Sequence, residues 1–145
     1  MVCNGRTVMA VEIEQRRPWA RYALLLLIGP GGVGKSTVGG LLAPLLGRGL
    51  IDLDHRFTER FGHIGGFISE RGYDTYKIAN SRLARETVSQ IDRPSILVLS
   101  SGFLSPDNHP DILAANKTVA TSGYSISLLP ALEAVMDWLR VERPV

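Results

Sequence analysis

Cysteine is almost absent from this chain, which carries only Cys3. A single cysteine excludes both an intrachain disulfide framework and a zinc site built from several thiolates. The three histidines, at positions 55, 63 and 109, lack the spacing of metal ligands. A chain of 145 residues is long enough to bury a core of its own, so it needs neither a disulfide nor a structural metal ion for stability.

Long apolar runs and strong net charge are lacking as well. The longest apolar run, residues 23–28, is far shorter than the ~20 residues that span a bilayer. No secretory signal pattern opens the sequence, so we expect a cytoplasmic protein without membrane contact. The net charge is only +2 and the basic residues are scattered, which argues against nucleic-acid binding. No feature indicates a protein partner.

A glycine-rich loop directly follows an apolar run. Residues 24–28 predict a strand buried on both faces. Gly29, Gly34, Lys35 and Ser36 then satisfy G-x-x-x-x-G-K-[ST], the phosphate-binding loop. The glycines allow positive φ and let main-chain N–H groups approach a polyphosphate, and the helix that follows points its positive end at the same phosphates.

The loop predicts a site for ATP with Mg²⁺. Lys35 can reach the β and γ phosphates, and the Ser36 hydroxyl can ligate the metal ion. The residues expected to bind the nucleotide are Gly29, Gly31, Gly32, Val33, Gly34, Lys35, Ser36 and Thr37.

The rest of the chain alternates between helical and strand patterns. Strands are predicted at residues 50–53 and 95–99, and a further one at either 118–121 or 124–129. A mostly helical stretch, in which residues 63–67 are weak, joins the first two of these strands. The apolar residues expected on its buried stripe are Tyr76, Ala79, Leu83, Ala84, Val88 and Ile91.

Three further helices are expected, one of them directly after the glycine-rich loop. Its sheet-facing side is predicted to be Val38, Leu41, Leu42, Leu45 and Leu46. Another helix is predicted to start at residues 105–107. The last follows Pro130 and carries Leu132, Val135, Met136 and Leu139.

This alternation predicts an α/β fold of the P-loop NTPase type, with three α/β/α layers around a central parallel sheet. Residues 1–20 are expected to be a poorly ordered extension, and residues 21–145 to form the domain. Ligands bind at the carboxyl ends of parallel strands. The loops 29–36, 52–54 and 100–102 should therefore converge there.

Asp52 and Asp54 stand two residues apart at a predicted strand end. On an extended backbone they would point the same way. Phosphoryl transfer needs a carboxylate to hold Mg²⁺ and a group to orient the attacking hydroxyl, and these two aspartates could divide that work. Alternatively, they are a pair of solvated carboxylates in a turn.

The sequence resembles the shikimate kinases, small P-loop kinases that move the γ-phosphate of ATP to a hydroxyl of shikimate. The resemblance runs in order from about residue 22 to 119. It rests on the P-loop and on four later segments, which are Leu46-Gly47-Arg48-Gly49-Leu50-Ile51-Asp52-Leu53-Asp54, Glu59-Arg60-Phe61-Gly62, Gly72-Tyr73-Asp74-Thr75-Tyr76-Lys77 and Leu97-Val98-Leu99-Ser100-Ser101-Gly102.

The resemblance implies a role for several of these residues. Lys35 and Asp54 would be catalytic, with Asp54 binding the acceptor hydroxyls and acting as base or orienter. Asp52 would hold Mg²⁺ through water, together with Ser36. The other substrate-binding residues would be Lys77, which would grip the acceptor carboxylate, and Ser101 and Gly102, which would present main-chain N–H groups to the acceptor.

This chain also departs from the family pattern. Lys77 replaces an arginine and Asn80 replaces a glutamate, while Ser100 and Ser101 stand where the family has glycine. Lysine cannot make the bidentate fork that arginine offers a carboxylate. Alternatively, Lys77 is a surface lysine on a helix, and residues 100–102 are a plain strand-to-helix turn.

The carboxyl-terminal part resembles the family less. Arg143 aligns with a lid arginine but stands near the chain end, and Asp137 lies near the place of an adenine-stacking arginine. The usual final strand and helix are not recognisable.

Three functional hypotheses follow. The leading one is a shikimate kinase-like enzyme that uses ATP and Mg²⁺. The second keeps the fold and changes the small hydroxylated acceptor. The third is a non-catalytic ATP-binding sensor of the same fold.

Overall fold

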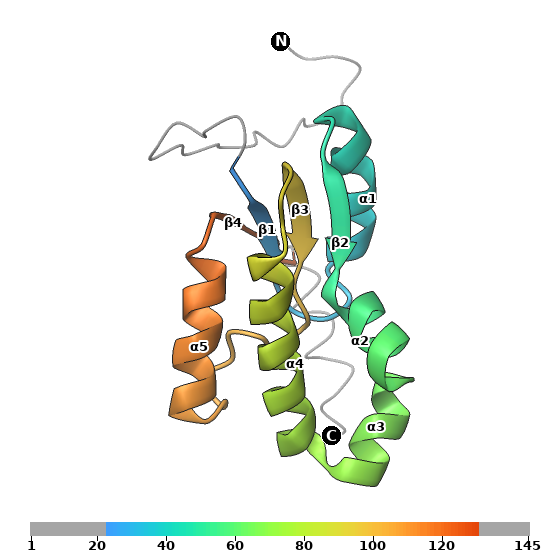
Figure 1. Ribbon diagram of the computed structural model, residues 1–145, viewed down its shortest axis with the longest axis vertical. Helices are drawn as coiled ribbons and strands as arrows, with labels where there is room; N and C mark the ends of the chain where they lie inside the picture. The colour runs from blue at the N-terminus through green and yellow to red at the C-terminus, as the bar shows by residue number, and fades with distance from the viewer. Residues whose placement is uncertain (1–22, 131–145) are drawn as a thin grey trace, which may run out of the picture.

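The computed structural model describes residues 23–130 and contains one four-stranded parallel sheet (Figure 1). Its strands are β1 (Leu25–Ile28), β2 (Gly49–Asp52), β3 (Ser95–Val98) and β4 (Tyr124–Ser127), in the spatial order β2-β3-β1-β4. All three pairings are parallel. The strand carrying the glycine-rich loop, β1, therefore lies in the interior of the sheet.

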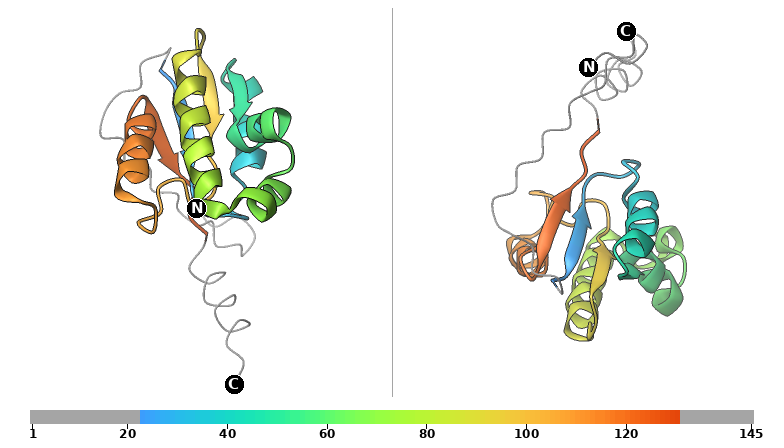
Figure 2. Two further views of the ribbon diagram at one scale, coloured as in Figure 1. Left: turned by 60° about the horizontal axis from the view of Figure 1, so that its bottom comes forward. Right: turned by 90° about the horizontal axis from the view of Figure 1, so that it is seen from above.

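Helices cover both faces of this sheet (Figure 2). The helix α1 (Lys35–Leu45) packs on one face, mainly against β2 and β3. The other helices are α2 (Leu53–Phe61), α3 (Ile64–Arg71), α4 (Tyr73–Ser89) and α5 (Pro110–Ala120). They belong to the core of the opposite face, where α4 contacts α2, α3 and α5. The predicted three-layer α/β/α fold is confirmed.

The strands alternate their side chains between two separate cores, which is why their sequences are continuously apolar. Leu26 and Leu97 point to the face covered by α2–α5. Leu25, Leu27 and Ile96 point to the α1 face. Both sets are almost completely buried, so the central strands are fixed by apolar burial on either side.

The predicted inner face of α1 is wrong for three of its five leucine and valine positions. Leu41, Leu45 and Leu46 are exposed, whereas Gly39 and Ala43 are buried. A Cβ at Gly39 would come within 2.9 Å of Val98 Cγ2. The helix thus approaches the sheet through its smallest residues. A count of large apolar residues could not detect this arrangement.

Two further boundaries differ from the prediction. The weak stretch at 63–67 does form a helix, because Phe67 and Ile64 pack into the core beside Phe57. The helix expected from residue 105 begins at Pro110 instead, with His109 accepting a hydrogen bond from Asp111 N–H as its N-cap.

The other strand predictions agree with the structure to within two residues. Of the predicted stripe, Tyr76, Leu83 and Ala84 are buried, Ala79 and Val88 are half-buried, and Ile91 lies beyond the end of α4. Of the two alternatives for the last strand, the one at residues 124–129 is right, since β4 spans Tyr124–Ser127. The proposed extension at 1–20 and the helix after Pro130, with Asp137 and Arg143, lie outside the described residues. Within residues 23–130, no helix combines the length and apolar character that crossing a bilayer requires.

Candidate functional site

The glycine-rich loop connects the carboxyl end of β1 to the first turn of α1. Gly29 is required by space, since a Cβ there would lie 2.4 Å from the Leu128 carbonyl oxygen. Gly34, the N-cap of α1, has φ +92°, a conformation that favours glycine. Gly31 does not have the expected positive φ. Its place in the loop instead brings it against the Ser101 side chain, 3.3 Å from where its Cβ would be.

Lys35 is buried, and its ammonium group folds back over this loop. Nζ donates hydrogen bonds to the carbonyl oxygens of Gly29 (2.8 Å) and Pro30 (2.9 Å) and to Ser101 Oγ (3.3 Å). Desolvation lowers the pKa of Lys35, while the nearby carboxylates of Asp54 and Asp52 act in the opposite direction. The Lys35 ammonium group therefore lies against the loop, near the carboxylates of Asp52 and Asp54.

Asp52 joins the loop to the start of α2. Its Oδ2 accepts a hydrogen bond from Ser36 Oγ at 2.5 Å. Its Oδ1 accepts from the N–H groups of Asp54 (3.0 Å) and His55 (3.3 Å), so Asp52 is the N-cap of α2. The prediction that Asp52 and Asp54 share an extended backbone is wrong, because α2 begins at Leu53. The helix turn still leaves both carboxylates beside the loop.

Asp54 is held by a hydroxyl from the end of β3. Ser100 Oγ donates to Asp54 Oδ1 at 2.5 Å, and Asn80 Nδ2 donates to Ser100 Oγ at 3.0 Å. Asn80 and Ser100 are both buried. Tyr76 lies beside this chain of hydrogen bonds. Burial, opposed by a hydrogen bond with Ser100, raises its pKa to about 12.

A cavity of about 240 Å³ opens between these groups. Its lining includes Gly32, Gly34, Lys35, Ser36, Thr37, Asp54 and Ser101. The phosphate loop, the second aspartate and Ser101 from the loop after β3 therefore face one space. This convergence was predicted from the sequence as the meeting point of three strand ends.

Lys77 lies outside the lining of this cavity. Its ammonium is 3.3 Å from Asp74 Oδ1 and 4.9 Å from the centre of the Tyr73 ring. The Tyr73 hydroxyl in turn lies 3.9 Å from where a Cβ of Gly102 would be. Tyr73 therefore lies between the Lys77 ammonium and the loop that follows β3.

The loop after β3 is pinned by two buried asparagines that the sequence analysis did not single out. Asn108 Nδ2 donates to the Gly102 carbonyl at 3.0 Å. Asn116 Nδ2 donates to the Phe103 carbonyl at 2.8 Å. Because side chains of α5 and its preceding turn make these bonds, the position of Ser101 and Gly102 is set by the fold rather than by the loop alone.

Comparison with known proteins identifies the family. The family model described as shikimate kinase matches residues 31–143. The chain belongs to the shikimate kinase family. A shikimate kinase from Chlorobium limicola is 39% identical over 82 residues, covering 56% of this chain and 39% of that protein. A shikimate kinase from Psychrobacter is 33% identical over 97 residues, covering 66% and 53%.

Solved structures of shikimate kinases show the same fold. The structure of shikimate kinase from Acinetobacter baumannii in complex with shikimate has a TM-score of 0.66 and 26% identity, covering 83% of this chain and 63% of that one. This chain therefore spans less than two thirds of the length of these shikimate kinase relatives. It also matches a pentafunctional AROM polypeptide of Candida glabrata, 32% identical over 120 residues, which are 80% of this chain and 7% of that protein.

Proposed function

We propose that this chain transfers the γ-phosphate of ATP to a hydroxyl group of shikimate or of a closely related small hydroxylated acid. The observation that carries the proposal is the convergence of Lys35, Ser36 and Asp54 on one cavity, with Asp52 hydrogen-bonded to Ser36. Phosphoryl transfer depends on positioning and on charge neutralisation, and these are the groups that supply both.

The loop fits a polyphosphate. A Cβ at Gly32 or Gly34 would meet no atom within 4 Å, so this part of the loop borders open space. Among residues 23–130, the hydrogen-bond partners of the Lys35 ammonium are carbonyl and hydroxyl oxygens. It can therefore exchange these neutral partners for phosphate oxygens, whose charge makes a stronger hydrogen bond.

Ser36 and Asp52 are the residues that would hold Mg²⁺. Within residues 23–130, no three His, Cys, Asp or Glu side chains gather as a metal site. Two oxygen ligands suit magnesium, which is usually bound by one or two carboxylates together with substrate phosphates and water. Bound there, the ion would neutralise charge developing on the transferring phosphoryl group.

Asp54 orients the acceptor hydroxyl and receives its proton. The carboxylate lines the cavity, and the Ser100 hydroxyl fixes one of its oxygens, which leaves the other to face the acceptor. The carboxylate group of the acceptor would replace Asp74 as the ion-pair partner of Lys77. Ser101 lines the cavity and Gly102 follows it in the loop that the buried asparagines hold in place, and their main-chain N–H groups would bind the acceptor.

A steady-state assay that couples ADP release to NADH oxidation, run with MgATP and shikimate, tests this function. We expect Lys35→Ala to lower kcat/KM by about 10²–10³-fold, as for removal of one donor that stabilises transition-state charge. Lys117→Ala is the matched control, because Lys117 is an exposed lysine on α5. Equal activity of the two variants would contradict the proposal.

The acceptor is tested separately. Turnover with another polyhydroxylated acid but not with shikimate would retain phosphoryl transfer and replace the acceptor. Tight ATP binding by calorimetry without a phosphorylated product from any acceptor would instead favour the non-catalytic sensor, for which Asp54→Asn should behave like the wild type.

A further inference from the structure

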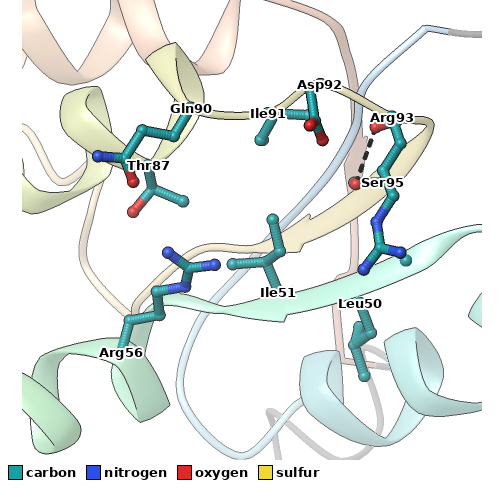
Figure 3. Close-up of a pocket in the computed structure, with 10 residues that line it drawn as sticks. Leu50, Ile51, Arg56, Thr87, Gln90, Ile91, Asp92, Arg93 and Ser95 are labelled. Carbon is teal, nitrogen blue, oxygen red and sulfur yellow. Dashed lines mark hydrogen bonds between the residues drawn. The ribbon is translucent and has the colours of Figure 1, made fainter.

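A second cavity lies under the free edge of the sheet, away from the phosphate loop (Figure 3). It has a volume of about 250 Å³ and is bounded by β2, the carboxyl end of α4 and the segment leading into β3. Its lining runs from Gly49 and Ser95, which start their strands, to Arg56 on α2. It shares no residue with the lining of the cavity beside the phosphate loop, so the two sites are separate.

Two arginines line this cavity without a counter-ion. Neither Arg56 nor Arg93 makes an ion pair within residues 23–130. Two glutamates line a neighbouring hollow together with Arg56. Glu86 is ion-paired with Arg60 (2.7 Å), and Glu59 Oε1 lies 3.3 Å from His55 Nε2. Because neither glutamate forms an ion pair with Arg56, its guanidinium is available to an external anion.

The cavity also contains an unsatisfied buried hydroxyl. Thr87 is only 2% exposed, and its Oγ1 has no hydrogen-bond partner in the part of the chain that the structure describes. Buried polar atoms are normally paired, so an unpaired one at a cavity wall indicates a missing partner. Figure 3 shows Thr87 and the Gln90 amide at the Arg56 end of the cavity. Hydroxyl, amide and guanidinium are all donors to a carboxylate.

The two cationic ends are separated by an apolar side chain. In Figure 3 the Ile51 side chain lies between the guanidinium groups of Arg56 and Arg93. A small ion such as acetate could contact only one end. A molecule with an acidic group at each end and a short hydrocarbon spacer would satisfy both guanidiniums and cover Ile51.

We propose that the cavity between Arg56 and Arg93 is a binding site for a small linear dicarboxylate. One carboxylate binds Arg56, Gln90 and the Thr87 hydroxyl, the other binds Arg93, and the spacer packs on Ile51. Asp92 is the one carboxylate in the lining and opposes the anion at the Arg93 end. The negative charge of Asp92 therefore disfavours ligands that carry more negative charge than a dicarboxylate. The proposal does not depend on the catalytic site.

Titration of the ¹⁵N-labelled chain with glutarate, followed by amide chemical shifts, tests the site residue by residue. We expect saturable shifts at Ile51 and at residues 91–93, with acetate binding at least about tenfold more weakly. Arg56→Gln and Arg93→Gln should each weaken glutarate binding by about tenfold, as for the loss of one charged hydrogen-bond partner.

Two further variants separate binding from folding. Arg85→Gln removes an exposed arginine of α4 outside the cavity and should leave glutarate affinity unchanged. Thr87→Val keeps the side-chain shape, should fold normally and should weaken binding several-fold. Shifts confined to residues 31–36, equal affinity for acetate and glutarate, or wild-type affinity in both arginine variants would overturn the proposal.

Discussion

The Ser100 hydroxyl lies 2.5 Å from Asp54 Oδ1 and joins the end of β3 to the first turn of α2. The same hydroxyl accepts a hydrogen bond from Asn80 on α4. Ser100 and Asn80 are two of the positions at which this chain departs from the shikimate kinase pattern. Because an amide at position 80 needs an acceptor and the hydroxyl at position 100 supplies it, we expect these two departures to depend on each other.

This coupling predicts that Ser100→Ala destabilises the fold by about 1–3 kcal/mol, since it leaves the buried Asn80 amide without a partner. Adding Asn80→Leu, which removes the amide and nearly preserves volume, should recover about 1 kcal/mol. Urea denaturation of the two single variants and the double variant measures this interaction energy. Effects that simply add would show that the two side chains act independently.

The two roles of Asp52 can be separated by a pair of substitutions. Asn keeps the oxygen that caps α2, so Asp52→Asn should change stability by less than about 0.5 kcal/mol. It removes the charge, and the Mg²⁺ concentration for half-maximal activity should rise about tenfold. Asp52→Ala should lose the cap as well, at a cost of about 1 kcal/mol. Thermal melts and Mg²⁺ titrations compare them; a similar loss of stability in both variants would contradict the capping role.

The raised pKa of Tyr76 predicts that alkaline pH lowers the stability of the folded chain. Burial raises its pKa from 10.0 to about 12 in the folded chain. Between these pH values the unfolded chain has lost the phenolic proton while the folded chain retains it, so stability falls as pH rises through this window. The effect is at most about 2–3 kcal/mol. Alkaline unfolding of the wild type should therefore be steeper than that of Tyr76→Phe. Identical pH dependence of the two proteins would refute the shift.

Adjacent glycines in α1 predict opposite effects of the same substitution. Gly39→Ala would push a methyl group against Val98 and Leu50 and should destabilise the chain by about 1–3 kcal/mol. Gly40 is exposed and has open space beside it, so Gly40→Ala should stabilise the helix by about 0.5–1 kcal/mol. Melting temperatures test the pair, and a shift of the same sign in both would show that α1 does not approach the sheet as described.

The glycine-rich loop and the buried strands could be predicted from the sequence because their signals are local. The five apolar residues before Gly29 indicate a strand that is buried on both faces. The residue spacing of the phosphate-binding loop corresponds to a known loop geometry. The convergence of Lys35, Asp54 and Ser101 followed from the rule that ligands bind where parallel strands end. These predictions needed no knowledge of which helices pack together.

The remaining features depend on tertiary contacts. Leu41 and Leu45 repeat at helical spacing, yet α1 turns Gly39 and Ala43 to the sheet because close approach favours small residues over large ones. The bond between Asn80 and Ser100 connects positions 20 residues apart, and no pattern in either segment indicates it. The only sign of this bond in the sequence is that positions 80 and 100 both differ from the family pattern. The contact between their side chains gives the physical reason.

Direct detection of the product tests the central claim, which is that Asp54 and the phosphate loop act together in phosphoryl transfer. The measurement is ³¹P NMR of the purified chain with MgATP and shikimate. We expect a new phosphomonoester resonance that grows as ADP forms. In Asp54→Asn its growth should be lost or slowed by about 10²-fold or more, with ATP affinity unchanged. Product formation at the wild-type rate by Asp54→Asn, or ATP bound by the wild type without any phosphomonoester, would contradict the central claim.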